Sequence, residues 1–270
     1  MPVNSHVQIP KSILKDFSSH EVEITDKGPS QYNYVYCLNM DGSITKSDIK
    51  DCNTIFGYYE DKVEKEIIKK YEDLIGNIKT NIFSLHKKGR ITLKKSDSDV
   101  VKSFLTTIFL RSPEIVKLYC ENSITCFLFP TSPQNQLLYE YEKQKELFNK
   151  FFDGYNINIF QNKTKINFII PQVCFYDILL SPNKEVMFVF PISPSVAIIL
   201  LKNIEKHIDV DGVLVHQMTT DENVIDRFNK NAIYAEYVYN KQKVYSKNLE
   251  DLERYSDFIK SLNNGENVQF

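Results

Sequence analysis

The chain has 270 residues, of which 42% are hydrophobic and 25% are charged, and its formal net charge is −2. These fractions are typical of a folded globular protein, and a chain of this length needs no disulfide or structural metal to stay folded. The near-neutral charge argues against a protein that coats nucleic acid with a strongly basic surface. The most apolar stretch, Val186 to Leu201, is interrupted by Pro191 and Pro194, so a membrane span is not expected.

The five cysteines are scattered along the chain, and their spacing is not that of a zinc site. Buried free thiols are therefore expected, as in proteins of a reducing compartment. The first eleven residues are polar and lack the apolar core of a signal peptide. These features predict a soluble protein of the cytoplasm.

The first predicted element is a β-hairpin over residues 31–50. Tyr32, Tyr34 and Tyr36 alternate as one face of a strand does, and Asp41-Gly42 supplies the turn. Residues 43–49 form the expected return strand.

Helical patterns follow the hairpin. From residue 60 to residue 85, apolar side chains recur every three or four positions, which predicts one long amphipathic helix. A second, mostly buried helix is expected to begin at Ser96 or Ser98, and Ser112-Pro113 either ends it or begins the next helix. A third runs from the cap Ser132-Pro133 to Phe152.

After Gly154 the pattern becomes strand-like. Short runs rich in Val, Ile and Phe predict strands at 156–160, 165–170, 186–190, 196–201 and 212–218. A helix capped by Thr220, a strand over 234–239 and a helix over 249–262 complete the chain. We therefore expect an α+β fold, with a helical N-terminal half packed on a mostly antiparallel C-terminal sheet.

The predicted organisation is one compact domain over residues 1–270. The hairpin and helices occupy 1–153, the strand-rich part 154–245 and the C-terminal helix 249–262. Residues 60–95 hold ten Lys or Arg and six Asp or Glu, so this region could contact nucleic acid or could form a solvated face.

Motifs that bind a nucleotide or a catalytic zinc are missing from the sequence, including the P-loop and the Gly-x-Gly-x-x-Gly loop. No cofactor is assigned, and a metal stays unknown. Glu64 and Glu72 are eight residues apart on the long helix, which places them about 80° apart on one side. They could act as acid and base or hold a metal, or they could pair with lysines along the helix.

Arg111 follows the buried helix. It could bind the terminal carbonyls of that helix, or it could face a pocket and bind a phosphate or a carboxylate. With His6, Glu64 and Glu72 it completes the set of candidate catalytic residues.

Several motifs, in order along the chain, resemble the family catalogued as domain of unknown function 4238. They are His6-Val7-Gln8-Ile9-Pro10 with Leu14 and Phe17, the hairpin around Val35-Tyr36 and Asp41-Gly42, the Glu64…Glu72 helix, Leu110-Arg111-Ser112-Pro113, Phe168-Ile169, Phe190 to Pro194, and Asn229 to Tyr239. The resemblance implies one compact domain and brings no established activity.

The chain departs from the family pattern at two places. Val7 and Gln8 stand where relatives often have His and Tyr, and Gln172 stands where they usually have Asp. Either that Asp is structural, or this chain has lost an activity, or Asp177 takes its place.

Three functions remain open from the sequence. The first is a non-catalytic protein that binds a protein partner or forms a homo-oligomer through aromatic surface, with a degenerate site. The second is a hydrolase that acts on nucleic acid or another phosphate-containing substrate. In the third, the same polar residues bond one another inside the core and only stabilise the fold.

Overall fold

The computed structural model describes the chain except for residues 1–3, 7, 27, 53, 57, 87–94, 123–131, 153–154, 181–184, 203–214, 241, 267 and 269–270. The chain divides into two compact units. Unit 1 comprises Met1–Pro10, Thr54–Ile157 and Lys202–Val215, and unit 2 comprises Lys11–Asn53, Asn158–Leu201 and His216–Phe270. The sequence analysis expects one domain over residues 1–270, and this expectation stays a prediction.

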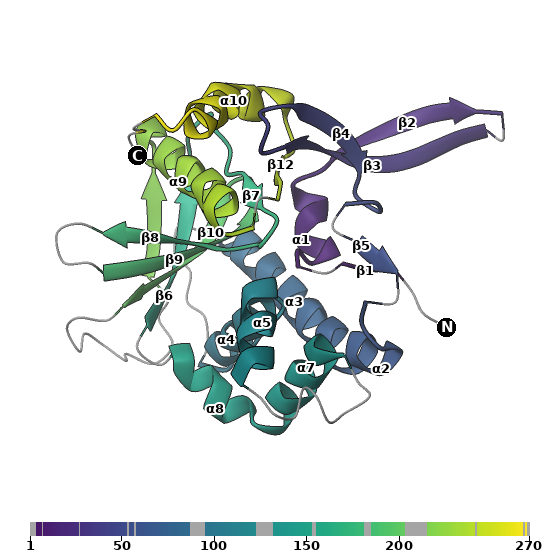
Figure 1. Ribbon diagram of the computed structural model, residues 1–270, viewed down its shortest axis with the longest axis vertical. Coiled ribbons are helices and arrows are strands. Elements are labelled where there is room, and N and C mark those ends of the chain that lie inside the picture. The colour runs from purple at the N-terminus through teal and green to yellow at the C-terminus, as the bar shows by residue number, and fades with distance from the viewer. Residues whose placement is uncertain are drawn as a thin grey trace. The chain divides into compact units, whose positions relative to one another are not determined.

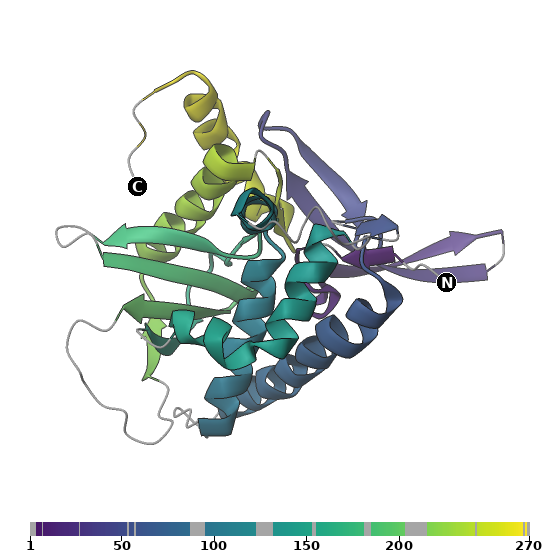
Figure 2. The same cartoon turned by 60° about the horizontal axis from the view of Figure 1, so that its bottom comes forward.

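Unit 1 is mainly helical (Figure 1). Its elements are β1 (Asn4–His6), β5 (Thr54–Phe56), α2 (Asp61–Val63), the π-helical turn η1 (Glu64–Ile68), α3 (Lys69–His86), α4 (Lys95–Leu110), α5 (Pro113–Asn122), α7 (Pro133–Lys143), α8 (Lys145–Asn149) and the 3₁₀ turn η2 (Lys150–Phe152). Figure 2 shows α3, α4 and α7 gathered as a bundle. In the part of the chain that the structure describes, no helix is both long and apolar enough to cross a membrane.

The apolar spacing of the sequence accounts for these helices. Val63, Ile67 and Tyr71 recur every fourth residue, and all three are buried. Pro113 and Pro133 each stand at the first residue of a helix, where a missing backbone N–H costs nothing. The three helices predicted for residues 60–152 are confirmed, and the last of them is broken at Gln144, which leaves helical geometry.

Unit 2 contains two five-stranded sheets. Its elements are α1 (Lys11–Asp16), β2 (Ser19–Thr25), β3 (Gly28–Leu38), β4 (Ile44–Asp48), β6 (Tyr155–Asn162, which begins in unit 1), β7 (Ile170–Pro171), β8 (Tyr176–Leu180), β9 (Glu185–Ser193), β10 (Val196–Lys202), β11 (Val215–Thr219), α9 (Glu222–Ala235), the π-helical turn η3 (Glu236–Asn240), β12 (Val244–Ser246) and α10 (Leu249–Asn263). One sheet has the order β11-β6-β10-β9-β8, and the other has β2-β3-β12-β7 with β4 on the free side of β3.

The predicted fold class is confirmed as mixed α and β, but the helical N-terminal half is wrong. Five strands, β1 to β5, lie within the first 56 residues, because side chains alternate there with period two. The predicted hairpin is among them, with β3 and β4 paired antiparallel and Gly42 at a positive φ of 85° in the turn. The packing of the helices on the sheet stays a prediction.

Two predicted strands are absent from the described chain for different reasons. Between residues 165 and 169 the backbone N–H groups of Phe168 and Ile169 bond to Pro194 O and to the side chain of Asn229, so these buried residues need no strand ladder. Residues 234–239 continue α9 into η3, since Phe228, Ala232 and Ala235 bury one helical face. The cap of α9 is Asp221 rather than Thr220, because the Asp221 carboxylate accepts the backbone N–H of Asn223 at 2.9 Å.

Segments distant in sequence share the second sheet. Val244 and Tyr245 of β12 pair antiparallel with Leu38 and Cys37 of β3 on one side, and β7 pairs with β12 on the other. Both β12 residues are buried, at 0% and 2% exposure. This sheet therefore joins the N-terminal hairpin to the C-terminal part of the chain.

Candidate functional site

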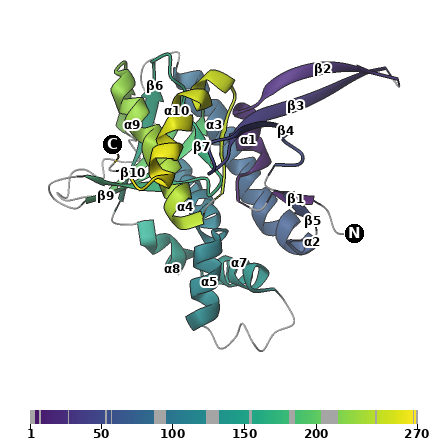
Figure 3. The same cartoon turned by 45° about the horizontal axis from the view of Figure 1, so that its top comes forward.

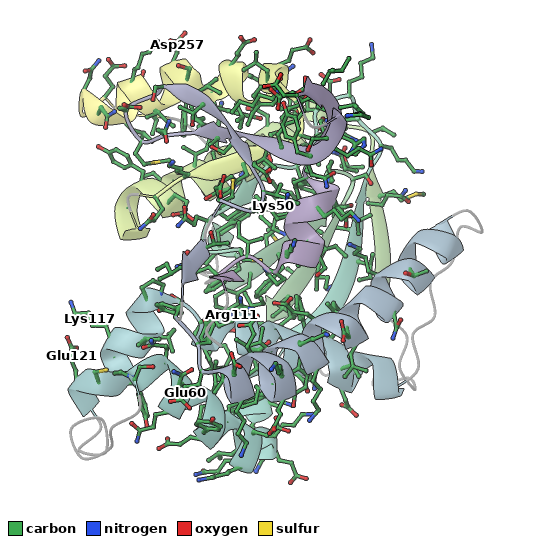
Figure 4. All side chains as sticks on the ribbon, turned by 90° about the vertical axis from the view of Figure 1, so that its right-hand side faces the viewer. Lys50, Glu60, Arg111, Lys117, Glu121 and Asp257 are labelled. Atoms are coloured by element: carbon green, nitrogen blue, oxygen red, sulfur yellow. The ribbon has the colours of Figure 1, made fainter. Side chains whose placement is uncertain are left out.

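Arg111, one of the candidate catalytic residues, lies in the core of unit 1. It follows α4 directly, and only 1% of its side chain is exposed. Its Nη1 donates to Glu72 Oε1 at 2.9 Å, and its guanidinium lies 5.6 Å from the ring centroid of Tyr59. Figure 4 labels Arg111 among the helices, while Lys117 and Glu121 project at the end of α5. Arg111 thus binds a carboxylate, as one interpretation predicts, but that carboxylate belongs to the chain itself.

Glu64 and Glu72 both act electrostatically on Arg111, and a π-helical turn that lies between them turns them toward the same side of the helix. A π-turn bonds residue i to i+5, so it adds one residue relative to an α-helix. Eight residues then behave as about seven, and the angle between the two side chains falls from about 80° to about 20°. Glu64 Oε2 is buried and has no hydrogen-bond partner. We call Tyr59, Glu64, Glu72 and Arg111 the Arg111 cluster.

The charges of the Arg111 cluster act on one another. Burial raises the pKa of Glu72, the Arg111 guanidinium opposes this rise, and the Glu64 carboxylate adds to it. Burial alone would lower the pKa of Arg111, but Tyr59, Glu72 and Glu64 together hold it above its usual value. With both carboxylates ionised, the cluster carries one net negative charge around a guanidinium that has almost no exposed surface.

The remaining candidate, His6, is in unit 1 as well. Its backbone lies in β1 and pairs with Thr54 of β5, while its side chain lies outside the described residues. Three of the four candidates therefore converge. Across the described residues, no group of three or more His, Cys, Asp or Glu side chains could hold a metal ion.

Gln172, which the resemblance sets in place of an Asp, is a hydrogen-bonded amide of unit 2. Gln172 Oε1 accepts the Tyr245 hydroxyl at 2.8 Å, and Gln172 N–H donates to Lys243 O at 2.9 Å. Asp177, the alternative, lies in β8 opposite Phe188 of β9. Gln172 therefore has a structural partner of its own.

The predicted basic region loses part of its charge to ion pairs. Lys65 lies 3.5 Å from Asp61, and Lys70 lies 2.6 Å from Glu142 of α7. Residues 87–94 of this region lie outside the described chain. The described part of the region thus resembles a solvated face of mixed charge more than a binding surface for nucleic acid.

Unit 1 also contains an apolar cavity of about 330 Å³ between α4, α5, α7 and α8. Leu118 and Phe151 line it and remain 53% and 48% exposed. The rings of Phe109 and Phe151 stack with centroids 5.1 Å apart. A lining so poor in polar groups offers little for catalysis.

Among the described residues of unit 2, the most exposed large apolar side chain is Ile24, which lies on β2, an element that the sequence analysis missed. β2 is the terminal strand of its sheet, and with residues 28–34 of β3 it forms a two-stranded ribbon that extends beyond β4 (Figure 3). Val22 is 53% exposed and Ile24 is 87% exposed. The alternation of residues 19–25, with Val22 and Ile24 between polar residues, is the signal that could have found this strand.

The two faces of this ribbon, which we call the β2 arm (residues 19–34), differ in character. Glu21 and Glu23 lie opposite Tyr32 and Ser30, and His20, Val22 and Ile24 point to the other face. On the first face, Glu21 accepts hydrogen bonds from the Tyr32 hydroxyl and from Lys46, and Lys46 also lies 3.7 Å from the centroid of the Tyr34 ring. The Lys46 ammonium and the Tyr32 hydroxyl hold the pKa of Glu21 below its usual range.

Comparison with protein-family models, curated proteins and solved structures finds no match to this chain. Assignment to the family catalogued as domain of unknown function 4238 therefore stays a proposal that rests on the motifs.

Proposed function

We propose that this protein is a non-catalytic, partner-binding member of the family catalogued as domain of unknown function 4238, and that it binds its partner along the open edge of β2. One observation carries the proposal. β2 is the terminal strand of its sheet, so one of its edges is not paired with another described strand, and its side chains Val22 and Ile24 are exposed. A two-stranded ribbon is marginally stable in water, and an open apolar edge is a template for a further strand.

The negative charges of the β2 arm favour a partner segment with basic side chains. Glu23 and Asp26 are exposed, and Glu21 adds a third carboxylate that Lys46 partly neutralises. An extended segment that alternates Lys or Arg with apolar residues would match both faces of β2, with main-chain hydrogen bonds for affinity and alternate side chains for specificity.

Self-association through this edge is disfavoured. If two copies of β2 paired antiparallel about a two-fold axis at Val22, Glu21 of each copy would lie opposite Glu23 of the other. If the axis lay at Glu23, that residue would face its own copy. Like charges directly opposite one another destabilise a strand pair. A basic partner segment therefore fits this edge better than a second copy of the chain does.

The test uses the full chain and fluorescent peptides. A peptide that alternates Lys and Val should bind, its affinity should fall as salt rises, and the amides of residues 19–25 should become protected from hydrogen exchange. A Glu/Val peptide and a Lys/Val peptide with a central proline are the matched controls. Glu23→Lys should weaken binding several-fold, whereas Glu253→Lys, at an exposed position of α10, should change it little. Equal binding of the acidic peptide, or unchanged exchange at β2, would reject the proposal.

The hydrolase is the second candidate, and the unpartnered Glu64 oxygen beside the Arg111–Glu72 pair is the observation that favours it. In this case Glu64 and His6 would transfer protons, while Arg111 would position Glu72. Phosphate esters and single-stranded nucleic acid, each with Mg²⁺ or Mn²⁺, are the substrates to assay. Activity that Glu64→Gln removes supports this candidate, and activity that survives the substitution contradicts it.

A further inference from the structure

Two buried cysteines of unit 2 lie together between β3 and the turn that follows β4. Cys37 of β3 is 1% exposed, and Cys52 is 5% exposed. The turn folds Cys52 back, since its backbone N–H donates to Asp48 O at 3.2 Å. The side chains of Cys37 and Cys52 are hydrogen-bonded to each other, and both are free thiols.

The surroundings of the two thiols differ. The hydrogen bond from Cys52 lowers the pKa of Cys37 the most, and the Ser47 and Thr45 hydroxyls and the Lys243 ammonium contribute in the same direction. The pKa of Cys52 is raised, first by its hydrogen bond to Cys37 and then by burial. The Ser47 and Thr45 hydroxyls bond Cys37 and favour its thiolate, so Cys37 is the expected nucleophile of the pair.

We propose that Cys37 and Cys52 form an oxidisable dithiol that a hydroperoxide converts into an intrachain disulfide between β3 and the turn after β4. The hydrogen bond between these two free thiols brings together the two sulfur atoms that such a bond would join. Lys50 and Asp51, next to Cys52, are exposed, so opening of this turn gives a small oxidant access without disruption of β3.

The chemistry balances with one hydroperoxide. The Cys37 thiolate attacks one peroxide oxygen, the O–O bond breaks, and the departing hydroxide takes a proton to become water. Cys52 then attacks the sulfur of the Cys37 sulfenic acid. The S–S bond forms, and the sulfenic oxygen leaves as a second water with the Cys52 proton. Two thiols are oxidised and one hydrogen peroxide is reduced to two waters.

Peptide mapping tests this directly on the full chain. Cleavage after Lys27, Lys46, Lys50 and Lys62 places Cys37 in peptide 28–46 and Cys52 in peptide 51–62, so a disulfide joins two separate peptides. Hydrogen peroxide is added to the folded protein, remaining thiols are blocked after denaturation, and the peptides are weighed with and without reductant. Cys120, a half-buried thiol of α5, is the internal reference.

The linked pair should appear before Cys120 is modified, and a thiol reductant should reverse it. Cys52→Ser should leave Cys37 as a sulfenic acid that dimedone traps, while Cys174→Ser, at another buried thiol of unit 2, should leave the crosslink unchanged. Prior oxidation of Cys120, a crosslink from Cys37 to any other cysteine, or sulfinic acid at Cys37 beside a free Cys52 in the unmodified sequence would overturn the proposal. The last three readouts need no variant to fold.

Discussion

The Arg111 cluster and the β2 arm differ in what they expose to solvent: the cluster buries charged side chains, and the arm exposes apolar ones. In the cluster, a guanidinium with 1% exposure is bonded to a carboxylate of the same chain. In the arm, Ile24 is 87% exposed on a strand at the edge of its sheet. The polar groups of the cluster interact with one another, whereas the arm exposes apolar side chains and the backbone groups of an edge strand. Residues whose chemistry looks catalytic in the sequence therefore need not be those that face a partner.

Hydrogen exchange should separate the two regions most strongly. Amides of residues 20–31 should exchange roughly a thousandfold faster than those of Phe104 and Leu105 in α4, because a ribbon without a core opens locally while a buried helix exchanges only on larger unfolding. Phe104 and Leu105 are 1% and 0% exposed. Similar protection in both regions would contradict the comparison and would imply that the arm is already covered.

Replacement of Arg111 by Met should lower the free energy of unfolding by about 3 kcal/mol, because it leaves Glu72 half-buried and unpaired. Urea unfolding measures the change. Arg111→Met combined with Glu72→Leu should recover most of the loss, since a buried ion pair replaced by apolar side chains is often neutral. A loss below about 1 kcal/mol for the single variant would contradict a stabilising role of the pair.

The loss caused by Arg111→Met should depend on pH. Arg111 opposes the rise of the Glu72 pKa, so its removal raises that pKa further above the unfolded value of 4.5. The folded variant then binds a proton more tightly than the unfolded chain, and its stability is retained near pH 4.5 and lost as pH rises through the raised pKa. The cost relative to the parent chain should therefore be at least about 1 kcal/mol larger at pH 8 than at pH 5. Arg111→Met with Glu72→Gln should remove this dependence, and a cost that grew on acidification would contradict it.

Substitutions on the β2 arm should change stability least. Ile24→Thr should shift the free energy of unfolding by less than about 0.5 kcal/mol, because the side chain has little contact to lose. Binding of the Lys/Val peptide should nevertheless weaken several-fold. Val238→Thr, at another exposed apolar position of unit 2, is the control that should leave peptide binding unchanged. A large loss of stability from Ile24→Thr would show that the arm is part of the core.

The candidate residues could be selected from the sequence, but their roles could not. Glu72 and Arg111 were predicted separately, one as part of a carboxylate pair and the other as a capping or phosphate-binding group. They are 39 residues apart along the chain and bond at 2.9 Å. Tyr59, which lies against the guanidinium, carries no local motif, and neither do the hydrogen-bonded thiols of Cys37 and Cys52. Tertiary packing brings such partners together, because the residues concerned are far apart in the sequence and no local pattern links them.

Side-chain spacing, or a turn within a few residues, is enough to specify the helices of residues 60–152, the hairpin of β3 and β4, and the final helix. Tertiary packing is needed to explain the π-turn η1, which rotates Glu64 toward Glu72 on the side of Arg111. It is also needed for the pairing of β12 with β3, two strands about 200 residues apart. Local periodicity depends on neighbouring residues alone. The pairing of distant strands and the burial of a charge depend instead on which surfaces come into contact when the whole chain folds.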